Sequence, residues 1–167
     1  HNVQSAEVLT FVDKFILEHG YGCTVETVPG DTVPTTTSMV EKGDPDVSSE
    51  TWVNLLPEVV PRGLAEGKII YGAPALPDGG IQGWWIPKYL ADAHPEIKTV
   101  DDALAHPELF PDPEDSGKGV IFNGAEDWGA TVVTAQLYKA YGAEAKGFNL
   151  MSPGSAAGLD GAIAKAY

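Results

Sequence analysis

The sequence predicts an α/β fold in which mainly parallel strands are flanked by helices. Segments with apolar residues at helical spacing alternate along the chain with short β-branched runs, and Gly and Pro punctuate the joins. Because a helix separates each expected strand from the next, the connections favour crossovers and therefore parallel pairing. At 167 residues, with hydrophobic residues at 43%, the chain is long enough for one domain or two small lobes.

Two helices are predicted near the beginning of the chain. Residues 5–19 form an amphipathic pattern that starts at Ser5 as a possible N-cap and stops at a glycine pair. Its apolar positions are Val8, Leu9, Val12, Phe15 and Ile16. Residues 32–42 form the second helix, with Pro34 in its first turn and Gly43 after its end.

Short strands are expected at 23–28, 46–49 and 68–71, where β-branched or apolar residues lie between turn signals. Residues 55–66 are expected to be helical in two pieces, because two prolines interrupt them. Together with the two helices, these segments predict a first lobe that spans residues 1–80.

A second lobe is expected over residues 81–167, after a crossover rich in Gly and Pro. It begins with short helices over 88–110 and a polar loop over 111–119. The expected elements that follow are a strand at 120–122, a helix at 127–141, a strand at 148–150 and a helix at 155–167. We also expect the fold to be incomplete at both ends, because no strand precedes the first helix and no C-cap signal follows the last.

Charge and composition exclude several classes of function. The net charge of −14 leaves no basic face for nucleic acid and no polybasic membrane anchor. No apolar run approaches the roughly 18 residues that a membrane span needs. A single cysteine, Cys23, excludes an internal disulfide and a zinc site built from cysteines. The sequence shows no export signal, so we expect any such signal to be absent from this chain.

Two tryptophans stand where expected strands pass into loops or helices. Trp52 follows the strand at 46–49, and Trp128 lies in the strand-to-helix loop of residues 123–130, which opens the helical segment at 131–141. In an open α/β sheet, the carboxyl ends of the strands face the ligand crevice. An indole face there attracts ammonium groups, with choline as a standard example of the class. The alternative is that each tryptophan packs into the core.

The residues after Trp128 predict a second kind of contact. Free backbone N–H groups at a helix N-terminus bind carboxylates, and Gly129 would let a ligand approach the N–H groups of Gly129 and Ala130. An ordinary helix start capped by Asp127 fits the same pattern. An aromatic face beside an anion-binding helix end would suit a zwitterion.

Other motifs favour no chemistry of their own. Adjacent Trp84 and Trp85 can place at most one indole in a cleft if they lie in a strand, and we interpret them as packing residues. The triplet His-Pro-Glu occurs at 94–96 and 106–108, but each proline disfavours the convergent geometry of metal ligands. No nucleophile elbow, HExxH or GxGxxG motif occurs. We therefore predict no catalytic residue, no metal and no cofactor.

Several motifs in one register resemble the substrate-binding proteins of glycine betaine/proline betaine ABC transporters, over nearly the whole chain. They are Gly20-Tyr21-Gly22, Val28-Pro29-Gly30-Asp31-Thr32-Val33-Pro34, Glu50-Thr51-Trp52-Val53-Asn54-Leu55-Leu56-Pro57-Glu58, Gly79-Gly80-Ile81-Gln82-Gly83-Trp84-Trp85-Ile86-Pro87-Lys88-Tyr89, Thr99-Val100-Asp101-Asp102, Asp127-Trp128-Gly129 and Pro153-Gly154-Ser155-Ala156-Ala157.

The resemblance implies a two-lobed, periplasmic-binding-protein-like receptor that is exported and delivers a compatible solute to a membrane permease. In that family an aromatic cage holds the quaternary ammonium and polar groups hold the carboxylate. Trp52 and Trp128 correspond to cage walls, and Gly129 and Ala130 to the backbone amides at the carboxylate. The family also has an earlier strand and a C-terminal continuation with a further cage aromatic, so this chain resembles a partial receptor.

The functional prediction is a solute-binding receptor of an ABC importer, periplasmic or otherwise extracytoplasmic, whose ligand is glycine betaine, proline betaine, choline or a related quaternary amine. One alternative is an enzyme acting on a small quaternary amine, with Glu50 or Asp127 as its acid/base residue. Another is a partner-binding fragment without ligand affinity.

Overall fold

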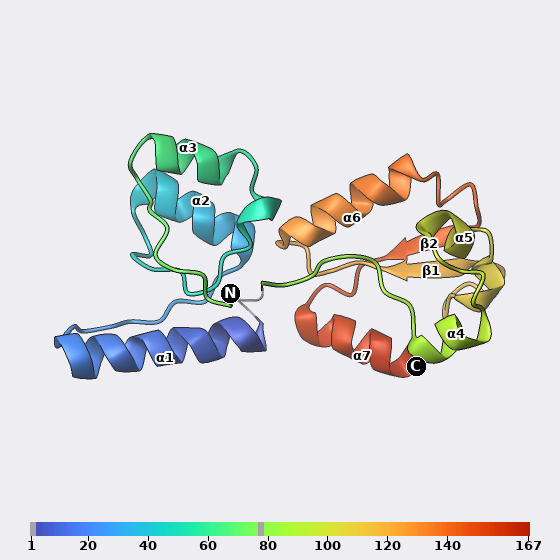
Figure 1. The fold of residues 1–167 in the computed structure, drawn as a ribbon, viewed down its shortest axis with the longest axis horizontal. Coiled ribbons are helices and arrows are strands. Elements are labelled where there is room, and N and C mark those ends of the chain that lie inside the picture. The colour runs from blue at the N-terminus through green and yellow to red at the C-terminus, as the bar shows by residue number, and fades with distance from the viewer. Residues whose placement is uncertain (1–2, 77–78) are drawn as a thin grey trace. The chain divides into compact units, whose positions relative to one another are not determined.

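The computed structural model describes residues 3–76 and 79–167. Contacts divide the chain into two compact units (Figure 1). Unit 1 contains residues 1–80 and 127–129, and unit 2 contains residues 81–126 and 130–167. Each unit is described by itself below, and the two-lobed organisation stays a prediction.

Unit 1 is helical in its described residues. Its elements are α1 (Gln4–Tyr21), α2 (Thr32–Lys42), the 3₁₀ helix η1 (Val53–Leu55) and α3 (Val59–Ala65). The helices predicted at 5–19 and 32–42 are confirmed. Gly22 and Gly43 end α1 and α2 in the left-handed conformation, which glycine adopts without steric cost.

Helices α2 and α3 pack together and form the small core of unit 1. Val40 of α2 and Val60 of α3 are buried, and Gly63 lies where the helices approach most closely. A Cβ at Gly63 would lie 2.6 Å from Cγ2 of Val40. Gly63 therefore permits a helix contact that a larger residue would open.

The three strands predicted in the first half do not form, and the backbone bonds of these segments show why. The N–H of Val25 donates to Oε1 of Glu18 at 3.4 Å, and its carbonyl accepts from Nζ of Lys14. The N–H of Lys68 donates to the Gly63 carbonyl of α3 at 2.9 Å. Residues 46–49 are likewise not a strand. A strand needs a neighbouring strand for its hydrogen bonds. Here two of the three segments form hydrogen bonds with helices instead, one with side chains of α1 and one with a carbonyl of α3.

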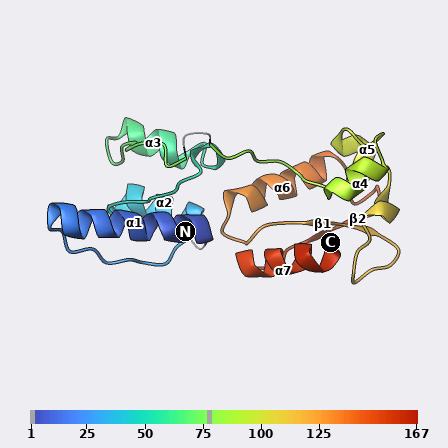
Figure 2. The ribbon, with the colours of Figure 1, turned by 60° about the horizontal axis from the view of Figure 1, so that its bottom comes forward.

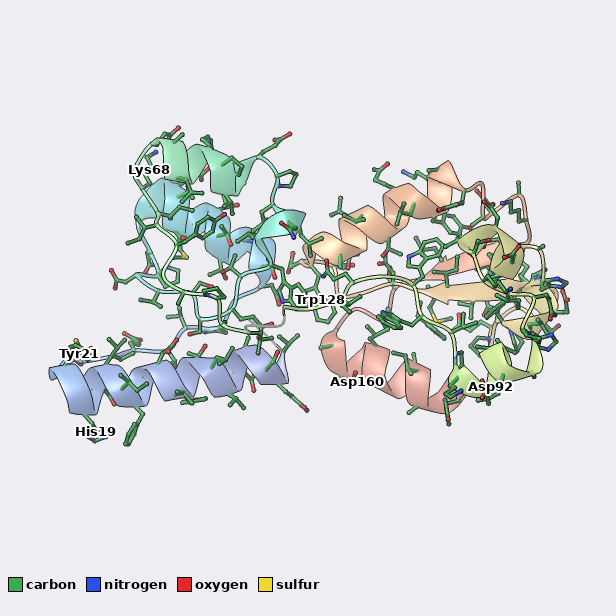
Figure 3. All side chains as sticks on the ribbon, viewed as in Figure 1. His19, Tyr21, Lys68, Asp92, Trp128 and Asp160 are labelled. Atoms are coloured by element: carbon green, nitrogen blue, oxygen red, sulfur yellow. The ribbon has the colours of Figure 1, made fainter. Side chains whose placement is uncertain are left out.

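Helix α1 has the predicted amphipathic pattern, but its apolar side faces solvent. Ala6 is buried and Lys14 is held to the segment after the helix, so the more polar side packs. Figure 3 shows His19, whose ring lies 4.6 Å from that of Phe15, pointing away from the other helices of unit 1. The exposed apolar residues are Val8, Phe11, Val12, Phe15 and Ile16.

Unit 2 contains a parallel pair of strands, β1 (Gly119–Phe122) and β2 (Phe148–Met151), in the register Gly119 to Phe148 through Phe122 to Met151. The predicted strands at 120–122 and 148–150 and their parallel pairing are confirmed. Helix α6 (Gly129–Ala140) joins the strands and α7 (Ala156–Ala166) follows β2. Both views place these two helices on opposite sides of the strands (Figures 1 and 2).

Short helices complete unit 2 over the range where they were predicted: α4 (Lys88–Ala93), α5 (Val100–Leu104) and the 3₁₀ helix η2 (Pro107–Leu109). Thr99 and Asp102 form a reciprocal capping box at the start of α5. The side chain of Ser155 accepts from the N–H of Gly158 at 3.0 Å and caps α7. These side chains satisfy N–H groups that have no acceptor within their own helices.

The core of unit 2 is built around Phe148 at the start of β2, whose side chain is buried together with Leu104 and Ala143. Tyr138 of α6 donates its hydroxyl to the Phe148 carbonyl at 2.6 Å, and burial raises the pKa of this hydroxyl. Partly buried residues pack around this centre, namely Val100, Phe110, Ile121, Tyr138 and Tyr141. The strands of unit 2 are therefore held by a shared core as well as by the ladder.

Trp84 and Trp85 differ in environment, although no strand contains them. Trp84 packs on Tyr141 with ring centroids 6.0 Å apart, and Trp85 is 75% exposed. The packing interpretation thus fits Trp84 but not Trp85, whose indole has little contact within the described residues.

Candidate functional site

Trp52 stands immediately before the 3₁₀ helix η1 in unit 1. Its carbonyl accepts from the N–H of Leu55 at 3.0 Å, which closes the first turn of η1. Just before it, the hydroxyls of Ser48 and Thr51 lie 2.8 Å apart. These local bonds fix the backbone at the position from which the partly exposed indole projects.

The indole of Trp52 is held at two points. Its Nε1–H donates to Oε1 of Glu50 at 2.9 Å. At the other end of the ring system, Gly80 lies so close that a Cβ there would be 2.1 Å from Cη2 of Trp52. The hydrogen bond and the glycine contact together determine the plane in which the ring lies.

Glu50 is an unusual partner for this tryptophan because it is only 7% exposed. Of its two carboxylate oxygens, Oε1 accepts from Trp52, whereas Oε2 is shielded from solvent and has no hydrogen-bond partner among the described residues. A buried carboxylate oxygen without a partner is costly. The site therefore holds a buried carboxyl group, with one oxygen unpartnered among the described residues, beside the Trp52 indole.

Trp128 lies at the end of the loop that follows β1, and hydrogen bonds of Asn123 hold this loop. The N–H of Asn123 continues the ladder by donating to the Met151 carbonyl at 2.8 Å, and its Nδ2 donates to the Thr131 carbonyl at 3.2 Å. The Thr131 hydroxyl in turn donates to the Ala125 carbonyl at 2.5 Å. These bonds connect the end of β1 to the first turn of α6, which begins right after Trp128 (Figure 3).

Gly129, the first residue of α6, lies against η1. A Cβ at Gly129 would be 2.6 Å from Cβ of Leu55 and 3.1 Å from its carbonyl oxygen. The residue after Trp128 therefore packs on the 3₁₀ helix that follows Trp52. The space that a side chain would take at Gly129 is filled by Leu55, which gives this glycine a packing reason beside the expected approach of a ligand.

The four site residues predicted from the sequence thus fall into two groups. Trp52, Trp128 and Gly129 belong to unit 1, where the contact between Gly129 and Leu55 links their two segments. Ala130 belongs to unit 2 and continues the first turn of α6. The N–H groups of this turn have no acceptor within the helix.

In each of the two His-Pro-Glu triplets, the histidine ring lies within hydrogen-bond distance of the glutamate side chain. Nδ1 of His94 lies 3.0 Å from Oε1 of Glu96, and Nδ1 of His106 lies 2.9 Å from Oε1 of Glu108. The pKa of each glutamate is lowered, first by its own backbone N–H and then by its histidine. Within residues 3–76 and 79–167, no three His, Cys, Asp or Glu side chains gather as metal ligands would.

Sequence reasoning missed two positions that shape the site. Asn123 directly follows a buried strand, and a polar amide at that point is a recognisable signal for a loop anchor. Gly80 carries a weaker signal, since the pair Gly79-Gly80 reads as an ordinary turn. Its contact with Trp52 joins residues 28 positions apart in the sequence and has no local signature.

An α/β chain with tryptophans at loop and helix junctions is typical of small-molecule binding domains. A comparison with family models specifies the class further. All residues from 1 to 167 match the OpuAC family, described as the substrate binding domain of ABC-type glycine betaine transport systems. The chain belongs to this family, as the resemblance in its motifs indicated. A comparison with curated proteins gave no match.

Family membership supports a substrate-binding role in ABC transport over an enzymatic one. It also supports the α/β interpretation, for which the parallel pair of β1 and β2 is direct evidence. No helix among the described residues has the length and hydropathy of a membrane span.

Proposed function

We propose that this chain binds a quaternary ammonium solute, such as glycine betaine, proline betaine or choline, and presents it to the permease of an ABC importer on the outer side of the membrane. The observation that carries the proposal is the fixed indole of Trp52, held by Glu50 and Gly80 in a chain of the glycine betaine family. An oriented aromatic ring can receive a cation without reorganising, which lowers the cost of binding.

The cation half of the site is assigned to Trp52 and Trp128. A quaternary ammonium has no N–H to donate, so it is recognised through its charge and its methyl groups, and an indole face offers both attraction and apolar contact. Trp52 and Trp128 are partly exposed. Their indoles therefore keep surface that a ligand can cover.

The anion half is assigned to the first turn of α6. The N–H groups of Gly129 and Ala130 project from the N-terminal end of a helix of 12 residues, where the helix dipole favours negative charge. The bonds of Asn123 and Thr131 hold this turn relative to the Trp128 loop. A ligand with a carboxylate near its ammonium would use both halves at once.

Signalling to the permease is assigned to closure of two lobes, residues 1–80 and 81–167, around the ligand.

The test is calorimetric titration of single-tryptophan variants with glycine betaine. We expect Trp52→Ala and Trp128→Ala each to weaken binding about thirtyfold, because each removes a cation–π face worth about 2 kcal/mol when desolvated. Trp85→Ala is the matched control, since Trp85 is 75% exposed and lies outside the proposed site. Unchanged affinity in both site variants would contradict the proposal, and turnover of the ligand would favour an enzyme instead.

A further inference from the structure

The carboxylate of Glu50 has properties that a purely structural role leaves unexplained. One oxygen would be enough to accept the N–H of Trp52, and a neutral glutamine could do this equally well. The chain nevertheless buries a group that is charged when ionised, with Oε2 lacking a partner among the described residues. Such an uncompensated anion costs stability, and natural proteins retain such costs mainly at functional sites.

The hydrogen bond places this charge at the indole itself. Nε1 of Trp52 and Oε1 of Glu50 are 2.9 Å apart, so the negative charge lies at the edge of the ring system that is assigned to the ammonium. A nearby anion raises the negative potential around the ring. Because the Glu50 side chain is only 7% exposed, this potential is screened less than it would be at an exposed site.

We propose that Glu50 is a positioning and charge-supplying residue of the ligand site, which orients Trp52 and makes its surroundings selective for a permanently cationic head group. This inference rests on the proposed function and deepens it, because it names the residue that makes the site prefer a positively charged ligand. In its absence, the indole faces alone would attract the positive charge of the trimethylammonium group.

Glu50→Gln separates charge from shape. Glutamine keeps an acceptor for the Trp52 N–H and nearly the same volume, but it removes the negative charge. The probe pair is choline and its neutral carbon isostere 3,3-dimethylbutan-1-ol, which has the same shape without the positive charge. Glu26→Gln, the same change at an exposed glutamate of unit 1, is the matched control.

We expect the wild-type chain to prefer choline over the neutral isostere, and we expect Glu50→Gln to reduce that preference about tenfold while Glu26→Gln leaves it unchanged. The ligand-free Glu50→Gln chain should also melt about 3 °C higher, because an unpartnered amide costs less to bury than an unpartnered carboxylate. The rise in melting temperature is a readout that a merely structural glutamate would not give.

Two outcomes would overturn the inference, and they differ from a failure of the proposed function. If Glu50→Gln retains the full preference for choline over the neutral isostere, the charge of Glu50 does not contribute to ligand selectivity. If Glu50→Gln lowers the melting temperature, the carboxylate is a stabilising group with a structural role. If instead the wild-type chain does not distinguish choline from the neutral isostere, the cation site itself is wrong and the proposed function fails with it.

Discussion

Unit 1 and unit 2 carry similar alternations of helices and apolar runs, yet among the described residues only unit 2 turns its apolar runs into paired strands. In unit 2, β1 and β2 pair and share a core with helix α6. In unit 1, two of the corresponding segments bond instead to helices: residues 23–28 to side chains of α1, and residues 68–71 to a carbonyl of α3. The same local pattern therefore has two outcomes.

The difference shows which part of a fold is local. A helix satisfies its backbone within itself, so α1 forms even with its apolar side in solvent. A strand depends on a second segment, and residues 23–28 and 68–71 form no ladder. The comparison predicts that equivalent changes in the two units have very different effects on stability.

The largest effect is expected for Phe148→Ala in unit 2. Phe148 is 2% exposed and contacts the ring of Phe110 with centroids 6.0 Å apart. Its removal leaves a cavity at the start of β2, and we expect the free energy of unfolding to fall by about 3–5 kcal/mol. Urea unfolding followed by circular dichroism measures this change. A loss below about 1 kcal/mol would mean that the core of unit 2 is not where the structure has it.

An intermediate effect is expected for Asp112→Ala, also in unit 2. The buried carboxylate of Asp112 accepts from Nδ2 of Asn149 and from the N–H of Glu114, both at 2.8 Å. Its removal leaves these donors without their acceptor and should cost about 2 kcal/mol in urea unfolding. Asp160→Ala, at an exposed position of α7, is the control and should change little.

Asp112 also predicts a pH dependence. The Asn149 amide, followed by the Glu114 N–H, lowers the pKa of Asp112 below the usual value of about 4. Its ionised form therefore stabilises the fold at any pH above that usual value, and the contribution is lost as the pH falls through the lowered pKa. The difference between wild type and Asp112→Ala should be constant near neutral pH and should shrink in acid. A difference that grows in acid would contradict this assignment.

The smallest effect is expected for Phe15→Ala in α1 of unit 1, the counterpart of Phe148→Ala. Phe15 is 64% exposed and contacts His19 on its own helix. We expect a change within about 0.5 kcal/mol in the same unfolding measurement. A loss as large as that of Phe148→Ala would show that the apolar side of α1 is covered in solution, and the contrast between the units would disappear.

The sequence predicted the helices better than the strands, for the same physical reason. Helix starts and ends are marked by capping residues next to them in the sequence, such as Ser155, Gly22 and Gly43. The strands of unit 2 were predicted correctly because their apolar residues pack in a hydrophobic core and each strand has a partner strand. Nothing in residues 23–28 indicates that Lys14 and Glu18 bind their backbone, because those side chains come from a helix whose position is set by tertiary contacts.

The sequence predicted the residues proposed to contact the ligand, but not the residues that hold the Trp52 indole in place. The positions of Trp52 and Trp128 after expected strands, and of Gly129 at a helix start, are visible in the sequence. The burial of the Glu50 side chain is not visible there, since glutamates usually face solvent. The contact of Gly80 with Trp52 likewise cannot be predicted locally, because it depends on the tertiary path that brings residue 80 back to residue 52.

The central claim is that this chain binds a quaternary ammonium solute through its cation half and gains affinity from its anion half when the solute carries a carboxylate. Calorimetric titration of the unmodified chain with glycine betaine, with choline as the competitor that lacks a carboxylate, tests it most directly. The account predicts saturable binding of glycine betaine and weaker binding of choline, because choline leaves the N–H groups of Gly129 and Ala130 without an anion. Saturation by choline at equal or higher affinity, or no binding of glycine betaine, would contradict it.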